Sequence, residues 1–281
     1  MADAAAPLIT PITPITPRID FARALAGLYD LSGQVAFLPG GYGGIGEAIA
    51  WALALAGARV MVAGRSAAKA EALASALRAA NHDARGVALD VHSLADIGNA
   101  TDAAMDAFGR LDILVNCVGI QREEPLGDVT EAAFDEVYRV NLKAAMFLAQ
   151  AAARRQIAGK RGGRQLHLLS VRSQLGLRKR GYSAYCSTKG ALVMLVKQHA
   201  MELAPERITV NGLAPTFVYT ELIRHVMENA AFRQQLEERI PLGRIADPKD
   251  VAGPALFFCA PASGFVTGQV LYVDGGITAS Q

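Results

Sequence analysis

Short apolar runs alternate with longer amphipathic stretches from Gln34 to the end of the chain. The runs consist mainly of Val, Leu, Ile and Ala without polar alternation, which is typical of strands buried on both faces of a parallel sheet. Strands are therefore predicted at 35–38, 60–63, 86–90, 111–115, 165–169, 208–213 and 270–273, and helices at 47–56, 66–80, 93–108, 131–157 and around Tyr185. This order predicts an α/β fold, a single-domain Rossmann-like doubly wound parallel sheet with helices on both faces. Its ligand site is expected beyond the carboxyl ends of the strands.

The first 24 residues do not follow this alternation. Residues 10–17 repeat Pro, Ile and Thr, and each proline fixes φ and biases the preceding residue toward extended geometry. We therefore predict an extended Pro/Thr-rich arm over residues 1–24, followed by one domain over residues 25–281. The arm either packs on its own domain or on a neighbouring subunit, or it forms a loosely held tail.

Composition and charge exclude several classes of protein. With 281 residues, 52% of them hydrophobic, the chain can bury one large core, and a net charge of +2 argues against a nucleic-acid partner. The three cysteines, Cys117, Cys186 and Cys259, lack C-x-x-C spacing, which favours a reducing compartment and neither a disulfide framework nor a metal site. Arg59 interrupts the most hydrophobic region, so no apolar run reaches the roughly 18 residues of a membrane span. The N-terminus has no basic segment before an apolar one, so we expect a cytoplasmic protein without a membrane partner.

Glycines cluster where the first strand is expected to meet the first helix. Gly40, Gly44 and Gly46 form a G-x-x-x-G-x-G pattern, in which a sharp turn brings the backbone close to a pyrophosphate. The N–H groups and the dipole at the start of the following helix attract the same anion. The position of this turn in an α/β chain favours nucleotide binding over an ordinary glycine-rich turn.

Tyr185 and Lys189 are four residues apart and therefore share one face of the predicted helix. An ammonium beside a phenol favours the phenolate, so we expect Lys189 to lower the Tyr185 pKa from about 10 toward neutral pH. Tyr185 is then a candidate to exchange a proton with a carbonyl or alcohol oxygen. On its own such a pair is more often a solvated surface contact, so its weight comes from the rest of the chain.

Several motifs occur in the order seen in the short-chain dehydrogenases/reductases, and the chain resembles this family from about residue 30 to its end. They are the glycine turn, Asn116-Cys117-Val118-Gly119, Asn141, Ser170, Tyr185-x-x-x-Lys189, and Pro215 with Thr220. The chain departs from the family pattern at Pro39 in place of Thr, at Cys117 and Val118 in place of Asn and Ala, and at Thr216 in place of Gly.

The resemblance implies a catalytic set of Ser170, Tyr185, Lys189 and Asn141. Tyr185 exchanges a proton with the substrate oxygen while a hydride moves between the substrate carbon and a nicotinamide. Lys189 lowers the pKa of that tyrosine and holds the nicotinamide ribose, Ser170 positions the oxygen, and Asn141 links Lys189 to solvent. Cofactor contacts are implied for Gly40, Tyr42, Gly43, Gly44, Ile45, Gly46, Arg65, Ser66, Asp90, Val91, Asn116, Cys117, Gly119, Tyr185, Lys189, Pro215, Val218 and Thr220.

Cofactor preference depends on the end of the second expected strand. NAD-dependent proteins place a carboxylate there, whereas an arginine suits the 2′-phosphate of NADP. This chain has Gly64 at the carboxylate position, followed by Arg65 and Ser66. A guanidinium pairs with a phosphate through two hydrogen bonds, so we expect NADP(H) to be favoured over NAD(H).

The stretches at 119–125, 170–176 and 185–191 resemble gluconate 5-dehydrogenases, which implies a sugar acid or polyol as the carbonyl or alcohol substrate. Arg122, Arg172, Ser170 and Tyr185 are the implied substrate contacts, with the arginines facing a carboxylate. The loop before Tyr185 is longer than in those proteins because of a basic cluster at 178–180, which either binds a carboxylate or is solvated. Alternatives are a general ketoreductase, a 3-oxoacyl-thioester reductase or a catalytically idle NADP-binding regulator. The resemblance also implies a mobile substrate lid at about 216–245 and a homotetramer.

Overall fold

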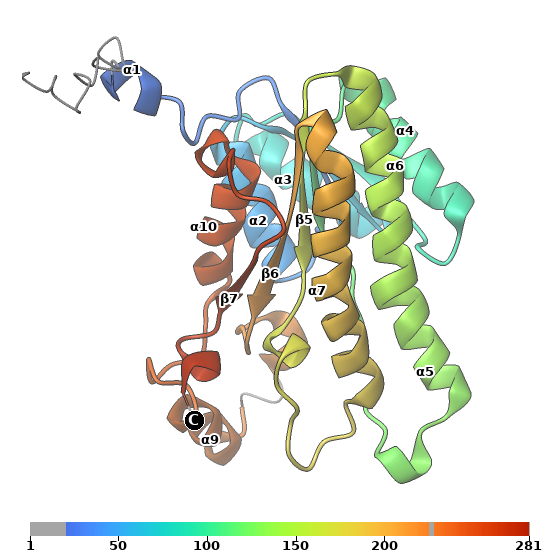
Figure 1. Ribbon diagram of the computed structural model, residues 1–281, viewed down its shortest axis with the longest axis vertical. Coiled ribbons are helices and arrows are strands. Elements are labelled where there is room, and N and C mark those ends of the chain that lie inside the picture. Colours follow the sequence, from blue (N-terminus) through green and yellow to red (C-terminus); the bar gives the residue numbers. More distant parts are fainter. Residues whose placement is uncertain (1–20, 225–227, 281) are drawn as a thin grey trace, which may run out of the picture.

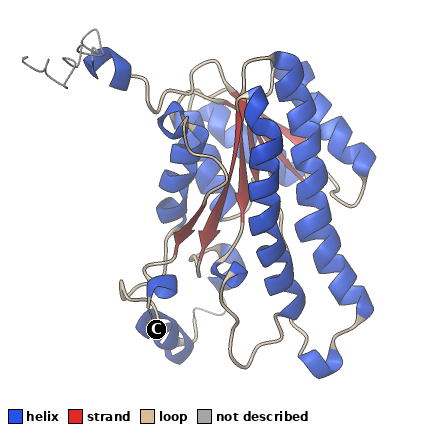
Figure 2. Cartoon of the chain, in the orientation of Figure 1, coloured by secondary structure: helices blue, strands red, loops and turns tan. Residues whose placement is uncertain are grey.

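The computed structural model describes residues 21–224 and 228–280, and a seven-stranded parallel sheet forms its centre (Figures 1 and 2). The strand order is β3-β2-β1-β4-β5-β6-β7. The strands are β1 (Val35–Pro39), β2 (Arg59–Gly64), β3 (Ala84–Ala88), β4 (Ile113–Asn116), β5 (Gly163–Leu168), β6 (Ile208–Pro215) and β7 (Val270–Val273). The predicted Rossmann-like sheet is therefore confirmed.

Helices cover both faces of this sheet, as Figure 1 shows. One face carries α2 (Ile45–Leu55), α3 (Ala67–Ala79) and α10 (Pro248–Cys259). The other face carries α4 (Leu94–Phe108), α6 (Ala144–Gly159) and α7 (Ser183–Leu203), with α5 (Glu131–Tyr138) leading into α6. The short helices α1 (Phe21–Leu25) and α9 (Ala230–Glu238) lie at opposite ends of the molecule (Figure 1).

Successive residues of each strand point to opposite faces, and both sets are apolar. In β1, Ala36 and Leu38 belong to the core beneath α2, α3 and α10, while Val35 and Phe37 belong to the core beneath α4 and α6. All four side chains are fully buried. Burial on both faces explains why the strands show no polar alternation in the sequence.

Several elements differ by one or two residues from their predicted bounds, and β3 and the helix predicted over 131–157 differ most. β3 occupies residues 84–88 rather than 86–90, because its pairing with β2 ends at Ala88. Gly86 within it lies against α3, where a Cβ would be 2.4 Å from the Glu71 nitrogen. The single helix predicted over 131–157 is α5 and α6 joined by a π-helical turn, Arg139–Lys143.

Two predicted segments are only partly described. The arm predicted over residues 1–24 lies mostly outside the described residues, which begin at α1. The segment at 216–245 contains a 3₁₀ turn (Glu221–Ile223) and α9, and its closing over a substrate stays a prediction. Within the part of the chain that the structure describes, no helix is long and apolar enough to traverse a lipid bilayer.

The sheet changes its winding direction between β1 and β4. These strands are hydrogen-bonded neighbours, although β2 and β3 separate them in the chain. In open parallel sheets a crevice forms outside the carboxyl ends of the strands at such a point. The candidate site lies there.

Candidate active site

A cradle of glycines lies between β1 and α2. Gly40 has a φ of +74°, and a Cβ on it would lie 2.9 Å from the carbonyl carbon of Cys117. A Cβ on Gly46 would lie 2.8 Å from the carbonyl oxygen of Gly40, and one on Gly44 would lie 2.6 Å from the methyl carbon of Thr220. Only glycine fits this packing, and the bare backbone lets an anion approach the N-terminus of α2 closely.

Beside this cradle lies a cavity of about 200 Å³ at the carboxyl ends of β1, β2 and β4. Seven predicted cofactor residues line it, namely Gly40, Tyr42, Gly43, Arg65, Val91, Cys117 and Gly119. A glycine turn at a helix N-terminus is the arrangement that receives the pyrophosphate of a dinucleotide, and the adjoining cavity has room for the adenosine end. The residues present therefore fit a nicotinamide dinucleotide, which supplies or accepts a hydride when bound.

Three further predicted cofactor residues shape the surrounding turns. Asp90 is exposed, and its carboxylate accepts a hydrogen bond from the His92 N–H at 3.0 Å, so it caps the turn after β3. Ser66 caps α3, where its hydroxyl oxygen accepts from the Lys69 N–H at 3.3 Å. Ile45 begins α2 and packs against the core beneath that helix.

An aromatic ring covers the end of β2. A Cβ on Gly64 would lie 2.2 Å from a ring carbon of Tyr42, so Tyr42 occupies the space that an acidic side chain would need. The Tyr42 hydroxyl accepts a hydrogen bond from the Ser66 N–H at 3.4 Å. Arg65 is exposed and borders the same cavity. The contact between Tyr42 and Gly64 was missed from the sequence, because it joins two separate turns and leaves no local pattern.

The turn after β4 is held by buried hydrogen bonds. The side-chain oxygen of Asn116 accepts from the Val118 N–H at 3.0 Å, and its amide nitrogen lies 3.3 Å from Nδ1 of His167. Burial lowers the pKa of His167 to about 3, so this imidazole is neutral and can accept that bond. The turn brings Gly119 to the predicted catalytic residues, since a Cβ on Gly119 would lie 3.5 Å from Nζ of Lys189.

The π-helical turn places Asn141 inside the protein. Its amide nitrogen donates to the Ile120 carbonyl at 2.9 Å and to the Thr188 hydroxyl at 3.2 Å, while its oxygen accepts from the Ile120 N–H at 2.8 Å. A π-turn re-aims a side chain relative to a regular helix and is frequent at functional sites. Neither this π-helical turn nor the hydrogen bond between Asn141 and Thr188 was predicted from the sequence. The available signal for that bond was the Thr188 hydroxyl, directly before Lys189.

Lys189 lies in α7, and its side chain is almost fully buried. Its Nζ donates to the carbonyl oxygen of Leu168 at 2.7 Å and lies 5.6 Å from the centroid of the Tyr185 ring. Burial lowers the Lys189 pKa to about 8, and the nearby Cys117 opposes this shift. Leu168 engages one of the three N–H donors of the ammonium, which leaves two for ribose hydroxyls.

Tyr185 lies in the first turn of α7, close to Ser170. Burial raises the pKa of Tyr185 to about 12, and the nearby Ser170 hydroxyl offsets only part of this rise. The expected fall of this pKa does not occur in the protein alone, because the loss of water around the phenolate dominates and Lys189 is not among the groups that shift it. Tyr185 keeps its proton at neutral pH, which suits a donor to a carbonyl oxygen.

The two predicted substrate arginines have different surroundings. Arg122 is exposed and borders both the nucleotide cavity and a smaller hollow beside the start of α7. Arg172 is almost fully buried in the turn after Ser170, and its guanidinium donates to two loop carbonyls at 2.7 and 3.3 Å. Among the described residues no carboxylate pairs with Arg172, whose surroundings include Tyr185. A cation in this position can receive the carboxylate of a substrate.

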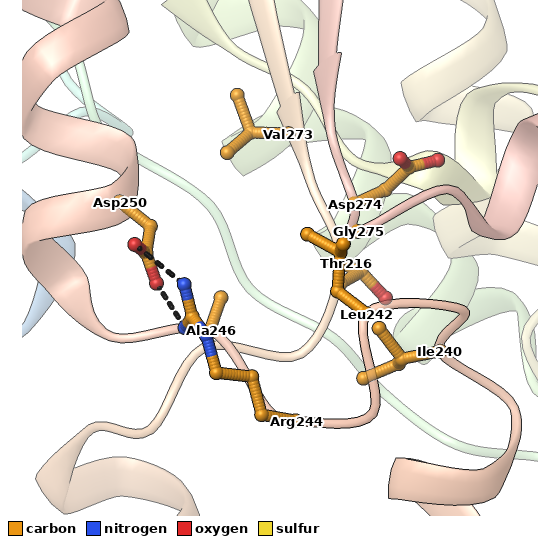
Figure 3. A pocket seen from close by; sticks show the side chains of 9 residues that line it. All are labelled: Thr216, Ile240, Leu242, Arg244, Ala246, Asp250, Val273, Asp274 and Gly275. Carbon is orange, nitrogen blue, oxygen red and sulfur yellow. Dashed lines mark hydrogen bonds and ion pairs between the residues drawn. The ribbon is translucent and has the colours of Figure 1, made fainter.

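The exit of β6 borders the other side of the site. Pro215 ends the strand, and Val218 forms a parallel bridge to the loop before α10. Thr216 lines a second hollow of about 240 Å³, which Figure 3 shows. In that figure both oxygens of Asp250 accept hydrogen bonds from Arg244, at 2.6 and 3.0 Å. This ion pair fastens the loop to α10 and does not belong to the catalytic set.

Known proteins are similar to this chain over almost its whole length. A family model described as Enoyl-(Acyl carrier protein) reductase matches residues 41–278. Gluconate 5-dehydrogenase of Gluconobacter oxydans (strain 621H) is 36% identical over 253 residues, which are 90% of this chain and 98% of that protein. L-xylulose reductase of Mesocricetus auratus is 37% identical over 246 residues, which are 88% of this chain and 97% of that protein.

A solved structure gives the same result. The crystal structure of a gluconate 5-dehydrogenase from Burkholderia cenocepacia J2315 in complex with NADP and tartrate matches with a TM-score of 0.86 at 37% identity. The match covers 92% of this chain and 100% of that one. With the glycine cradle and the Ser170, Tyr185 and Lys189 cluster in place, the chain belongs to the short-chain dehydrogenase/reductase family of oxidoreductases.

Proposed function

We propose that this protein is an NADP(H)-dependent oxidoreductase that interconverts a ketone and a secondary alcohol on a sugar acid or polyol, similar to the gluconate 5-dehydrogenases. The observation that carries the proposal is the meeting of Ser170, Tyr185, Lys189 and Asn141 beside the nucleotide cavity. The Lys189 ammonium lies over the Tyr185 ring, Ser170 lies close to that tyrosine, and Asn141 bonds the loop that borders both. Separately, any of these residues has a structural explanation, but together they form a proton donor beside a hydride site.

In the reducing direction, a nicotinamide dinucleotide held by the glycine cradle would supply the hydride that reduces the substrate carbonyl. Tyr185 gives its phenolic proton to the carbonyl oxygen, so that the product is a secondary alcohol. Ser170 donates a hydrogen bond to the same oxygen, and a preorganised donor of this kind is worth about 10²–10³ in rate. The ammonium of Lys189 stabilises the phenolate that Tyr185 becomes, until a proton returns from solvent.

The end of β2 supports NADP(H) over NAD(H). A carboxylate that would bind the ribose diol has no room at Gly64, because the Tyr42 ring lies there. Arg65 follows directly and borders the cavity, where its guanidinium can pair with a 2′-phosphate. The matching gluconate 5-dehydrogenase from B. cenocepacia was crystallised with NADP.

Arg172 supports an acidic substrate. Its buried guanidinium lies near Tyr185 and has only backbone carbonyls as hydrogen-bond partners among the described residues. We propose that it binds the substrate carboxylate and that the exposed Arg122 contributes at the rim. A neutral sugar of similar length would make no use of Arg172.

A panel of carbonyl compounds tests these proposals. Purified protein is assayed with NADPH and with NADH against 5-ketogluconate, L-xylulose, an acetoacetyl thioester and simple ketones. We expect the highest kcat/KM with NADPH and 5-ketogluconate, whereas preference for the thioester would favour a 3-oxoacyl-thioester reductase. Binding of NADPH in the absence of any turnover would favour a regulator.

The same panel tests whether Arg172 binds the substrate carboxylate. Arg172→Met is expected to raise KM for 5-ketogluconate about ten-fold or more, the effect of a lost charge-assisted hydrogen bond. KM for L-xylulose, which has no carboxylate, serves as the matched control and should stay near that of the wild type. An equal rise of KM for both substrates would show that Arg172 only stabilises its own loop.

We further propose a cytoplasmic homotetramer. Met194 and Met201 on α7 are about two-thirds exposed, and Met146 and Ile157 border a groove between α6 and α7. At another face, the edge strand β7 exposes Leu271. Two separate self-complementary surfaces with different two-fold axes generate a tetramer. The three cysteines are free thiols, which supports a reducing compartment. Light scattering tests the assembly, and Met194→Lys is expected to halve its mass.

A further inference from the structure

The loop before α7 is held against the loop after β4. The Glu124 N–H donates to the Gly181 carbonyl at 3.0 Å, and a Cβ on Gly181 would lie 2.2 Å from the carbonyl carbon of Glu124. Next to this backbone contact, the guanidinium of Arg180 donates to both carboxylate oxygens of Glu123. The two loops are therefore joined by a backbone hydrogen bond and by an ion pair.

Arg180 also contacts an aromatic residue next to the catalytic tyrosine. Its guanidinium carbon lies 5.5 Å from the centroid of the Tyr182 ring. The Tyr182 ring stands edge-on to the Tyr185 ring, with centroids 6.0 Å apart and planes at 71°. A guanidinium donates within its plane and stacks on its face, so one arginine can bind Glu123 and Tyr182 together. A continuous path of contacts thus runs from Glu123 to the proposed proton donor.

The basic cluster at 178–180 is not uniform. Arg178 and Lys179 are exposed, and neither forms an ion pair with any residue that the structure describes. Arg180 and Glu123 are about one-third exposed, and their mutual hydrogen bonds raise the pKa of the arginine and lower that of the carboxyl, so both stay charged. Arg180 is therefore engaged by Glu123 and is not a cation offered to a substrate.

We propose that the Glu123–Arg180 ion pair is a clasp that joins these two loops and holds Tyr182 as an aromatic wall of the substrate site beside Tyr185. Arg180 is thus a positioning residue, which acts on the substrate through Tyr182. The proposal rests on the proposed function, because it assigns a wall to that same site. An aromatic face there packs on the C–H groups of a sugar chain and limits which carbonyl groups reach Tyr185.

Charge-removing variants test the clasp. Arg180→Gln and Glu123→Gln break it, while Arg178→Gln removes the same charge from the same loop without breaking an ion pair. We expect KM for the best carbonyl substrate of the panel to rise about five-fold in the clasp variants, the size of a lost ion pair at the surface, with kcat changed less than about two-fold. Arg178→Gln should keep the wild-type KM.

Double variants test the path of action. Arg180→Gln combined with Glu123→Gln should be no worse than either single variant, because both break one contact. In a Tyr182→Leu background, Arg180→Gln should add nothing to KM. Full additivity in either case would overturn the clasp.

Hydrogen–deuterium exchange gives a readout that is independent of turnover. In Arg180→Gln, the amide groups of both loops, 119–125 and 174–182, should exchange faster than in the wild type, because the clasp protects both. In Arg178→Gln their exchange rates should stay at the wild-type values. Equal behaviour of the two variants, or faster exchange without a change in KM, would overturn the proposal. A wild-type protein without carbonyl turnover would refute the proposed function instead, and exchange alone would then decide whether the clasp exists.

Discussion

The nucleotide end and the catalytic end of this site are built in different ways. At the nucleotide end the shape comes from the backbone, because Gly40, Gly44 and Gly46 leave no room for a Cβ. At the catalytic end it comes from buried polar side chains, of which Lys189 and Asn141 are almost completely enclosed. Substitutions that add atoms should therefore weaken cofactor binding at the nucleotide end. Substitutions that remove charges should change activity and stability at the catalytic end.

The difference has an energetic side. Close backbone contacts at the glycine turn bury no charge, so they cost little beyond the entropy of glycine. At the catalytic end, burial lowers the pKa of Lys189 and raises that of Tyr185, which shows that the folded protein disfavours both charged forms. Placing a cation beside a phenol there lowers the stability of the folded protein, as is common at functional sites.

The largest effect is expected at the catalytic end. Tyr185→Phe removes the proton donor and keeps the ring, so kcat/KM should fall by about 10²–10⁴. The Kd of NADPH, measured by its fluorescence, should stay near the wild-type value because the glycine cradle is untouched. Near-full turnover of this variant would remove Tyr185 from the proposed mechanism.

Lys189→Met should lose activity and gain stability. Below pH 8 both folded and unfolded chains carry the ammonium, and the drop of its pKa from 10.5 to about 8 corresponds to a cost of about 3 kcal/mol in the folded state. Loss of the bond to Leu168 offsets part of this gain, so we expect about 1–2 kcal/mol and a Tm higher by about 2–8 °C. A lower Tm measured by calorimetry at pH 7 would show that interactions of the ammonium in the folded protein offset the cost of burying it.

The nucleotide end should respond to added atoms. Gly64→Asp alone should weaken NADPH binding about ten-fold, since the new side chain meets the Tyr42 ring and repels the phosphate. Combined with Tyr42→Ser, which clears the space, the same aspartate should bind NADH about ten-fold more tightly than the wild type does. Titrations of both cofactors check this, with Tyr42→Ser as the control. A gain of NADH binding by Gly64→Asp alone would show that the Tyr42 ring yields easily.

The smallest effect concerns pH. The Lys189 pKa is lower in the folded state, so its cost is complete below about pH 8 and declines as the pH rises toward 10.5, where the unfolded chain also loses its proton. The stability advantage of Lys189→Met should therefore shrink between pH 7 and pH 9.5. Urea unfolding of both proteins at the two pH values measures this, and a constant difference would contradict the low pKa.

Most of the fold was predictable because it follows from local patterns. Apolar runs without alternation indicated each of the strands, and the observed ends of every strand lie within two residues of the predicted ones. The interruption at Arg139–Lys143 was not predictable, because a π-turn requires no particular residue types. Within the site, the candidate catalytic residues were selected by order and spacing, but the partners of Asn141 and Lys189 are backbone and side-chain groups from other elements.

By itself, the sequence determined the parallel sheet, the glycine turn and the set of candidate residues for proton transfer, because each depends on residue type and spacing along the chain. Only the tertiary structure decided how these groups behave. It enclosed Lys189, partly buried Tyr185, laid the Tyr42 ring over Gly64 and paired Arg180 with Glu123. Burial and charge pairing depend on neighbours that are distant in the chain, so a pKa or a steric limit appears only when the elements have packed together.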